Sequence, residues 1–292
     1  MMKRILVTGS TGFIGNAVIR KLLQFGYEII ATSSNEINAR KNKWFQEVKY
    51  IPFDLRSFSS DLDYFTFFHR PDYMIHLAWE GLPNYTQNFH LTENLPRHLS
   101  FLSNMLRNGL NDLTVTGTCL EYGFQTGCLL ETLETAPSNP YAMAKDELRK
   151  SLQVLTKELD FNLKWLRLFY MYGEGQSSTS IIPQLDKALK NKDKIFNMSG
   201  GEQVRDFSHI DDIAGYIVMA MQQKKINSII NCCSGIPVTV KDFVAEYLLS
   251  TNQTIELNLG YYPYTTYEPM EFWGNATKLQ EIIALDSHNQ QV

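Results

Sequence analysis

The sequence lacks the features of several protein classes. It has four cysteines, with no CxxC pair and no cysteine or histidine spacing typical of zinc sites. Neighbouring Cys232 and Cys233 cannot easily form a disulfide with each other, so a reduced setting and no metal site are predicted. After Met-Met-Lys-Arg the apolar run is only Ile5, Leu6 and Val7. This run is too short for a signal peptide, and no later segment is long enough to span a bilayer, so we expect a cytoplasmic protein.

The chain also has no excess of basic residues. Lys and Arg number 27 against 31 Asp and Glu, which gives a net charge of -4. This balance predicts no nucleic-acid partner and no anionic membrane partner. An anionic ligand would have to be held by local cations and backbone groups. The 292 residues, 44% of them hydrophobic, are sufficient for one large core or two smaller ones.

Short apolar runs alternate with helical patterns along most of the chain. Strands are expected at 4–9, 28–33, 49–54, 73–78, 113–118 and 163–173, with one more at 227–235. Strict alternation of strand and helix predicts an α/β fold with a Rossmann-type, doubly wound parallel sheet. Continuous apolar strands fit a sheet that is covered on both faces. After Gly173 the pattern becomes irregular and tyrosine-rich, notably at 260–269, and the end at 287–292 is expected to be a frayed tail.

A glycine-rich loop follows the first expected strand. VTGSTGFIG places Gly9, Gly12 and Gly15 between that strand and the opening of a helix. A diphosphate needs close backbone approach, free N–H groups and the positive end of a helix dipole, and glycine permits the first two. Strand, spacing and helix agree, so a dinucleotide-binding loop is predicted rather than a simple tight turn. The loop residues assigned to the cofactor are Gly9, Thr11, Gly12, Phe13, Ile14 and Gly15.

The end of the second expected strand bears on the choice of dinucleotide. An acidic residue about 20 residues after the loop would bind the ribose 2′-hydroxyl of NAD. Ser33 and Ser34 occupy this place, and the first carboxylate is Glu36. Small hydroxyls leave room for a 2′-phosphate, and Arg40 or Lys41 could pair with it, although either is as readily part of a solvated helix face. NADP, as NADPH, is therefore favoured over NAD. Asp54 and Leu55, which close the third strand, are assigned to the adenine side, although an aspartate there is often only a turn former.

The segment SNPYAMAKDEL, residues 138–148, carries a tyrosine and a lysine four positions apart. Asn139 is expected to cap a helix that begins at Pro140. Tyr141 and Lys145 then share the face that packs on the sheet with Leu148, Leu152, Leu155 and Leu159. A free tyrosine has a pKa of about 10, too high for acid–base work at neutral pH. A neighbouring cation is expected to lower it by roughly 1–3 units. Tyr141 is therefore predicted to be a proton donor, and Lys145 the cation that tunes it.

A second hydroxyl is expected at the end of the fifth strand. The run VTGTCLEYG contains Thr116 and Thr118, and strand ends at the carboxyl edge of a parallel sheet line the ligand crevice. Thr116 is interpreted as a β-former. Thr118 is predicted to hydrogen-bond the substrate carbonyl oxygen. Trp79, Tyr85 and Tyr172 are candidates for the substrate pocket, although aromatic residues at strand ends are more often part of the core.

With these residues assembled, the chain resembles the extended short-chain dehydrogenase/reductases, specifically the nucleotide-sugar epimerase/dehydratase group. The resemblance covers almost the whole chain and rests on TGSTGFIG, DL at 54–55, HLA at 76–78, EYG at 121–123, PYAMAK and RDFSHIDDIA at 205–214. It implies that Thr118 assists Tyr141 and that Arg205 meets the nucleotide diphosphate. Leu77, Ala78 and Asn94 match positions near the cofactor.

Departures from the family pattern narrow the chemistry. Dehydratases of the group carry Asp and Glu directly after the threonine, where this chain has Cys119 and Leu120, so dehydration is not expected. Tyr170 replaces an asparagine often found after the sixth strand and is retained as a substrate-binding candidate. Ser33 in place of an acid favours exchangeable NADPH and hence a reductase. The resemblance thus implies NADPH-dependent reduction of the 4-keto group of a nucleotide-linked 6-deoxy sugar, for deoxy-sugar or surface polysaccharide biosynthesis.

Two alternatives use the same fold. An NAD-dependent nucleotide-sugar 4-epimerase would share Thr118, Tyr141 and Lys145. A non-catalytic NADP-binding sensor is more distant, because such proteins tend to lose the tyrosine or the lysine. The partner expected in each enzyme case is a nucleotide-diphosphate sugar, and a homodimer is expected through helices at 88–107 and 140–159.

The expected domains follow from these assignments. Residues 1–172 form the NADP-binding Rossmann domain, to which 206–236 return. Residues 173–205 and 237–292 form a smaller substrate-binding lobe.

Overall fold

The computed structural model describes residues 2–264 and 268–289. In this part of the chain, a sheet of seven parallel strands has the order β11-β7-β5-β4-β1-β2-β3. The strands are β1 (Arg4–Thr8), β2 (Glu28–Thr32), β3 (Lys49–Tyr50), β4 (Tyr73–His76), β5 (Asp112–Thr118), β7 (Asn162–Leu168) and β11 (Ile229–Cys232). The strand order reverses between β1 and β4, which is the arrangement of a doubly wound fold. The predicted Rossmann-type α/β class is therefore confirmed.

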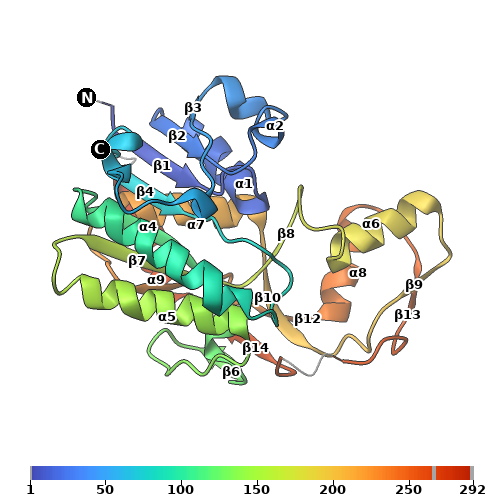
Figure 1. Ribbon diagram of the computed structural model, residues 1–292. Helices are drawn as coiled ribbons and strands as arrows, with labels where there is room; N and C mark the ends of the chain where they lie inside the picture. The colour runs from blue at the N-terminus through green and yellow to red at the C-terminus, as the bar shows by residue number, and fades with distance from the viewer. Residues whose placement is uncertain (1, 265–267, 290–292) are drawn as a thin grey trace.

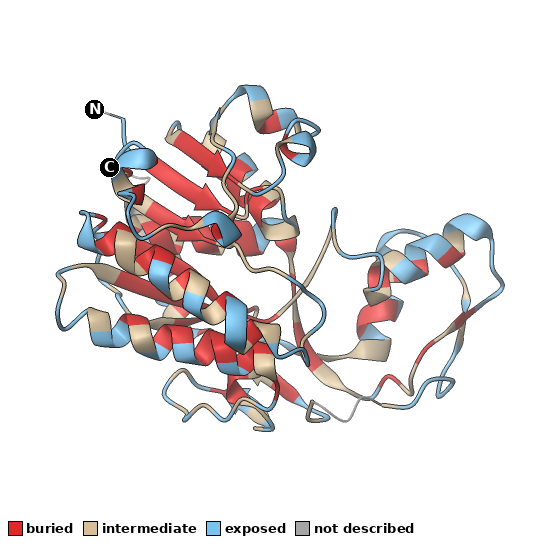
Figure 2. Cartoon of the chain, viewed as in Figure 1, coloured by how far each residue is buried: buried red, intermediate tan, exposed pale blue. Residues whose placement is uncertain are grey.

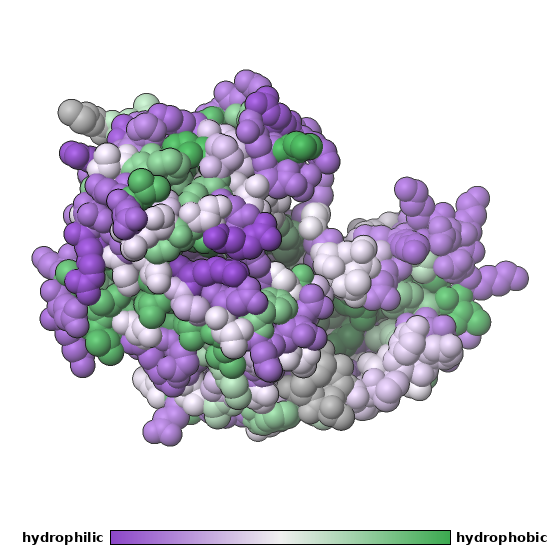
Figure 3. Space-filling model, in the orientation of Figure 1, coloured by the Kyte–Doolittle hydropathy of each residue, from purple (hydrophilic) through white to green (hydrophobic). Residues whose placement is uncertain are grey.

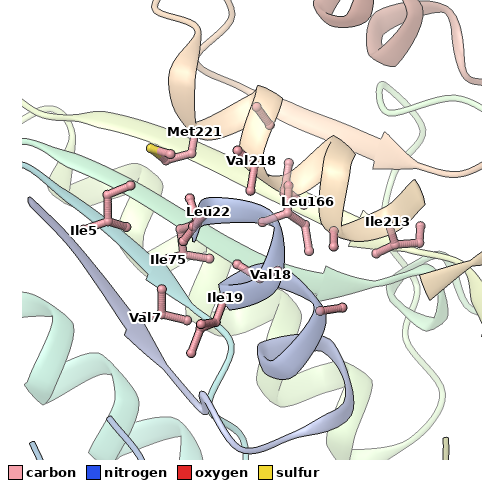
Figure 4. Packing of buried hydrophobic residues seen from close by; sticks show 14 of the residues in the cluster. Ile5, Val7, Val18, Ile19, Leu22, Ile75, Leu166, Ile213, Val218 and Met221 are labelled. Atoms are coloured by element: carbon pink, nitrogen blue, oxygen red, sulfur yellow. The ribbon is translucent and has the colours of Figure 1, made fainter. Parts of the chain in front are cut away.

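Helices cover both faces of this sheet (Figure 1). One face carries α4 (Leu95–Arg107) and α5 (Pro140–Leu155), and the other carries α1 (Phe13–Leu23), α7 (Ile210–Gln222) and α9 (Thr277–Asn289). Figure 4 shows aliphatic side chains of β1, β4 and β7 meeting those of α1 and α7. Because both faces are covered, the strands other than the edge strand β3 are buried along most of their length (Figure 2), which explains their continuous apolar sequences.

The predicted single strand at 163–173 is wrong, because the chain changes sheets within it. β7 pairs with β5 and β11, whereas β8 (Tyr170–Tyr172) pairs with Phe207–His209 of β10 (Val204–His209). β10 also pairs with β12 (Pro237–Thr239). Phe169 lies between the two strands, and its ring packs 6.3 Å from that of Phe272. The apolar pattern continues through this junction, so sequence did not reveal the change of partner.

The region that sequence predicted to be irregular contains a second, smaller core. There, α6 (Ile181–Asn191) and α8 (Val240–Ser250) pack together beside β9 (Ile195–Asn197) and β13 (Glu256–Asn258). The core cluster of this lobe contains Leu185, Ala188, Phe196, Met198, Val244 and Leu248. In Figure 1 it stands to the right of the main sheet. β6 (Gly127–Leu129) and β14 (Phe272–Gly274) form a further strand pair.

Several element boundaries differ from the predictions. The third strand, expected at 49–54, pairs only over Lys49–Tyr50, and a short helical turn η2 (Leu55–Ser57) follows. The helix expected at 88–107 is a wide turn, η3 (His90–Asn94), that continues into α4, and the helix expected at 140–159 ends at Leu155. Other short elements are α2 (Glu36–Ala39), η1 (Lys43–Gln46), α3 (Tyr64–Phe67) and η4 (Cys119–Tyr122).

The predictions at the end of the chain fall partly outside the described residues. The tyrosine-rich run at 260–269 includes residues 265–267, and the expected tail at 287–292 includes 290–292, neither of which is described. The rest of that tail, through Asn289, belongs to α9. None of the helices in residues 2–264 and 268–289 combines the length and apolar character needed to cross a membrane.

Candidate active site

The glycine loop packs against the end of β4. Gly9 has a φ of +67°, and a Cβ at this position would lie 2.7 Å from the Ala78 nitrogen. A Cβ on Gly15 would overlap the carbonyl oxygen of Gly9. Gly12 caps α1 without a side-chain hydrogen bond, so the first N–H groups of that helix stay available to an anion. Glycine at positions 9 and 15 thus lets the loop close on itself and on the end of β4. The N–H groups that remain available at the start of α1 fit the diphosphate of a dinucleotide.

The remaining loop residues assigned to the cofactor, Phe13, Ile14 and Thr11, make contacts that stabilise the start of α1. Phe13 and Ile14 are half-buried and pack against the core beneath that helix. The Thr11 carbonyl oxygen accepts a 3.0 Å hydrogen bond from Asn16 Nδ2.

Ser33 and Arg40, which follow β2, are both engaged with neighbouring side chains. Ser33 Oγ lies 2.9 Å from the Tyr50 hydroxyl. Arg40 forms an ion pair with Glu36, and its guanidinium lies 5.2 Å from the centre of the Phe45 ring. Ser34 is exposed. As sequence predicted, the carboxyl end of β2 carries no carboxylate. A 2′-phosphate would nevertheless have to compete with Glu36 for Arg40.

The remaining assigned cofactor residues have mainly structural contacts. The N–H groups of Leu77 and Ala78 donate to Thr8 Oγ1 at 3.2 and 3.3 Å. Asp54 forms a 2.5 Å ion pair with Arg56, and this pairing lowers the pKa of its carboxyl. Leu55 is buried. Asn94 is also buried, and its Nδ2 donates a 3.0 Å hydrogen bond to the Glu80 carbonyl oxygen.

Thr118 stands at the last position of β5, where a buried carboxylate fixes its backbone. Its N–H donates to Glu121 Oε1 at 2.9 Å, and its hydroxyl accepts from the Leu120 N–H at 3.3 Å. Glu121 is fully buried and also accepts from Arg167 Nε at 2.8 Å and Trp165 Nε1 at 3.0 Å. This reciprocal Thr–Glu capping box, with its buried cation, holds the Thr118 hydroxyl at the strand end.

Tyr141 begins α5 next to this hydroxyl. The side chain of Asn139 accepts from the Ala142 N–H at 2.9 Å, and Pro140 opens the helix, as predicted from the sequence. Tyr141 is 7% exposed, and Thr118 hydrogen-bonds its hydroxyl. The Tyr141 N–H donates to the Tyr85 carbonyl oxygen at 3.1 Å. The phenol is thus held at the carboxyl edge of β5 by contacts from two separate segments.

Lys145 lies one turn further along α5 and is 2% exposed. Its Nζ donates a 2.9 Å hydrogen bond to the Thr116 carbonyl oxygen and lies 4.2 Å from the centre of the Trp79 ring. The tyrosine and the lysine are therefore both buried at the sheet, on the helix face that periodicity predicted.

The expected lowering of the Tyr141 pKa by Lys145 is not what the structure favours. Burial raises the pKa of Tyr141 well above its usual range, and the Thr118 hydrogen bond opposes this only in part. Burial lowers the pKa of Lys145 to about 7, against the raising effect of Glu121 and Glu80. For both groups, removal from water has the largest effect on the pKa. Tyr141 is consequently a neutral phenol at neutral pH, the form that donates a proton.

Arg205, expected to meet a diphosphate, is buried and already paired. Its Nη2 lies 3.1 Å from Glu268 Oε2, and its guanidinium lies 4.6 Å from the Phe272 ring centre and 5.7 Å from that of Tyr170. Burial raises the pKa of the Tyr170 hydroxyl well above its usual range. Arg205 and Tyr170 are thus neighbours, but an anionic ligand would have to share Arg205 with Glu268.

The three aromatic candidates separate into two places. Trp79 and Tyr85 lie beside Tyr141, with ring centres 6.0 and 5.4 Å from it. Tyr172 instead packs edge-on to His209 and Phe243 and lines a cavity of about 1090 Å³ bounded by α6, α8 and β10. Figure 3 shows the surface hollowed between the main body and the lobe.

Sequence reasoning missed four polar residues of this region. Glu121 lies three residues after Thr118, the spacing of a capping box, so its hydrogen bond to the Thr118 N–H was predictable from the sequence. Glu80, His98 and Glu268 follow no local pattern, and they contact the site only because of the tertiary fold.

Comparison with known proteins gives two kinds of similarity. Residues 5–233 match the family described as the NAD dependent epimerase/dehydratase family. The chain is 30% identical over 273 residues to dTDP-6-deoxy-L-talose 4-dehydrogenase (NAD(+)) of Aggregatibacter actinomycetemcomitans, covering 92% of this chain and 98% of that protein. It is 23% identical over 267 residues to dTDP-4-dehydro-6-deoxyglucose reductase of Escherichia coli, covering 87% and 81%.

Solved structures share the fold. The UDP-glucuronic acid 4-epimerase of Bacillus cereus, solved with UDP-glucuronic acid and NAD, superposes with a TM-score of 0.82 at 22% identity, covering 96% of this chain and 93% of that one. At this identity the likeness concerns the fold.

Proposed function

Because the chain belongs to the NAD dependent epimerase/dehydratase family, we propose that it is a nicotinamide-dependent oxidoreductase that acts at C4 of a nucleotide-linked 6-deoxy sugar. In the reductive direction it converts the 4-keto group to an alcohol. The observation that carries this proposal is the buried Tyr141 hydroxyl, hydrogen-bonded to Thr118 at the sheet edge and one helical turn from Lys145. The names of the two relatives, a 4-dehydrogenase and a 4-keto sugar reductase, support the choice of C4.

The chain's own residues manage the proton in this reaction. A bound nicotinamide dinucleotide supplies the hydride that adds to the carbonyl carbon. Thr118 donates a hydrogen bond to the carbonyl oxygen and orients it toward Tyr141. As the hydride adds, the Tyr141 hydroxyl gives its proton to the forming alkoxide, and the ammonium of Lys145 stabilises the resulting phenolate. Solvent then returns a proton to the phenolate. Cys119 and Leu120 supply no carboxylate, which argues against dehydration.

The site residues divide between cofactor and substrate in this proposal. The loop Gly9–Gly15 holds the diphosphate of the dinucleotide, with the strand ends at 33–34, 54–55 and 77–78 beside it. The lobe built from α6, β9, α8 and β13 holds the nucleotide sugar, with Tyr170 and Arg205 at its junction with the main sheet. Helix α9, which sequence assigned to this lobe, packs on the main sheet instead. Arg205 would exchange its pairing with Glu268 for the substrate diphosphate.

The choice between NAD and NADPH rests on opposed observations. Ser33, Ser34 and Arg40 support NADPH, because the β2 end offers hydroxyls and a cation. The relative that is 30% identical carries NAD(+) in its name, which favours NAD. We propose NADPH on the strength of Ser33, Ser34 and Arg40, the residues of this chain at the β2 end. Titration of the purified protein with NADPH and NADH, followed by fluorescence, tests this choice directly.

Turnover assays test the reductase itself. The purified protein is mixed with dTDP-, GDP- or UDP-linked 4-keto-6-deoxyhexoses and NADPH or NADH, and loss of the reduced cofactor is followed. We expect one equivalent to be consumed per sugar reduced, and no consumption with Tyr141→Phe. The absence of consumption with every one of these sugars would contradict the proposal.

A 4-epimerase is the second candidate, because the named relatives include a putative UDP-glucose 4-epimerase of Methanocaldococcus jannaschii, 26% identical over 247 residues. An epimerase would interconvert two nucleotide sugars without net consumption of cofactor and would retain NAD through purification. Mass spectrometry of the retained cofactor separates the two candidates. Cofactor binding without either reaction would point to the sensor. The homodimer stays a prediction that light scattering of the purified protein can check.

A further inference from the structure

Lys145 contacts an aromatic side chain that the proposed reaction does not use. Its Nζ lies 4.2 Å from the ring centre of Trp79, and the same amine donates to the Thr116 carbonyl oxygen. A cation over the face of an indole is attracted by the negative potential of the ring, most strongly when the cation is desolvated. Lys145, at 2% exposure, is in that situation.

Histidines hold the indole on two sides. Trp79 Nε1 donates a 3.1 Å hydrogen bond to His90 Nδ1. The ring also stacks on His98, with centres 4.5 Å apart and an interplanar angle of 23°. The indole meets Tyr141 edge-on at 6.0 Å. Trp79 therefore touches both members of the tyrosine–lysine pair and has little freedom to rotate.

His98 is itself fixed by a chain of hydrogen bonds. Thr8 Oγ1 lies 2.9 Å from His76 Nδ1, His76 Nε2 lies 2.7 Å from His98 Nδ1, and His98 Nε2 lies 3.1 Å from Glu80 Oε2. One proton on Nε2 of each ring gives every contact a donor and an acceptor, ending at the Glu80 carboxylate. Burial lowers the pKa of both histidines, so both are neutral at neutral pH.

We propose that Trp79 is a positioning residue of the active site, whose indole, clamped by His90 and by the Glu80–His98–His76 chain, keeps the Lys145 ammonium charged and fixed beside Tyr141. The role rests on the function proposed above, in which Lys145 serves Tyr141. It replaces the sequence-based expectation that Trp79 binds the sugar. Other titratable groups that act on Lys145 or contact its neighbours are Glu80, Glu121, His76, His90, His98 and Tyr141.

Fluorinated tryptophan tests the role without a change of shape. Trifluorotryptophan, incorporated at every tryptophan of the full chain, weakens the negative face of the ring while its packing stays nearly the same. The apparent pKa of Lys145 is then measured from the pH dependence of its side-chain carbon NMR signal, which the Lys145→Met variant assigns. We expect a fall of about half to one unit, that is, about three to ten times more free amine at a pH below the pKa.

A matched control isolates the position. Trp79→Phe protein, grown with the same fluorinated amino acid, keeps fluorinated rings at Trp44, Trp165 and Trp273, so its Lys145 pKa should equal that of unfluorinated Trp79→Phe. An unchanged Lys145 pKa in the fluorinated parent, or an equal fall in the Trp79→Phe pair, would overturn the proposal. Because the NMR titration needs no sugar, this result is independent of whether 4-keto reduction is observed.

A kinetic readout complements the NMR titration. Trp79→Phe retains a smaller ring and should lower kcat about tenfold with little change in cofactor affinity, whereas Trp273→Phe, on β14, should leave both unchanged. A larger KM for the sugar with an unchanged kcat would instead assign Trp79 to substrate binding and would overturn the positioning role.

Discussion

The Nζ of Lys145 donates a 2.9 Å hydrogen bond to the carbonyl oxygen of Thr116, two residues before Thr118 on the same strand. This bond ties the helix that carries the tyrosine–lysine pair to the strand that carries the threonine. Backbone geometry thus sets how Thr118, Tyr141 and Lys145 lie relative to one another. Helix α5 and strand β5 need to move together for the three groups to stay in register.

Replacement of Tyr141 by Phe should remove the proton donor and leave the fold intact. The ring remains packed beside Trp79 and Tyr85, and only the hydroxyl bonded to Thr118 is lost. We expect kcat for 4-keto reduction to fall by about 10²–10⁴-fold, with cofactor affinity nearly unchanged. Steady-state kinetics and cofactor titration measure both quantities. A fully active Tyr141→Phe protein would remove Tyr141 from its assigned role.

Lys145→Met should stabilise the protein, and by an amount that depends on pH. The folded pKa of Lys145 is about 7, below the ordinary value of 10.5, so between these pH values the unfolded chain binds more protons than the native one. The cost of burying the ammonium is complete below about pH 7 and fades as the pH rises toward 10.5. The stability advantage of Lys145→Met should therefore be greatest at neutral pH.

Urea unfolding of both proteins at a series of pH values measures this effect. The difference in unfolding free energy should shrink with increasing pH, with a steepest slope of about 1.4 kcal/mol per pH unit. Groups that do not interact with Lys145 titrate alike in both proteins and cancel. If the difference in unfolding free energy stays constant from neutral to alkaline pH, the pKa of Lys145 in the folded protein is not lowered.

Glu268→Gln should destabilise the protein through Arg205. The two side chains are 13% and 5% exposed, and loss of one partner leaves a buried guanidinium without its counter-charge. We expect a loss of about 3 kcal/mol in unfolding free energy. If Arg205 takes the diphosphate of the substrate, a nucleoside diphosphate should raise the melting temperature of Glu268→Gln more than that of the parent. Glu271→Gln, at an exposed position nearby, is the control, and equal ligand effects on all three proteins would argue against Arg205 as the anion site.

Arg40→Ala should discriminate between the two dinucleotides. If Arg40 leaves Glu36 to pair with a 2′-phosphate, its loss should weaken NADPH binding about tenfold and leave NADH binding unchanged. Lys41→Ala tests the neighbouring candidate in the same titration. If neither variant changes the affinity for NADPH, the proposed 2′-phosphate site is wrong and NAD becomes the preferred cofactor.

The Rossmann core was predictable because its signals are local. Gly9, Gly12 and Gly15 follow a buried strand directly, and Asn139-Pro140 marks the start of α5 whatever the rest of the chain does. The junction at Phe169 was not predictable, because the apolar run LKWLRLFYMY does not record that its second part pairs with β10 instead of β5. The helices α6 and α8 were also missed. Their apolar faces pack on each other in a separate small core, and the sequence was interpreted there as irregular.

By itself, the sequence determined the fold class, the glycine loop and the burial of Tyr141 and Lys145 on one helix face, because spacing along a strand or helix dictates which side chains share a face. Only the tertiary structure decided what surrounds those groups. The groups around Lys145 come from separate elements: Trp79 follows β4, Glu80 is in the next loop, and His98 is on α4. They lie next to one another because α4 packs beside α5 on the sheet. Likewise, Arg205 meets Glu268 across 63 residues of sequence. Contacts of this kind depend on packing in three dimensions, and desolvation by that packing raises the pKa of Tyr141 and lowers that of Lys145.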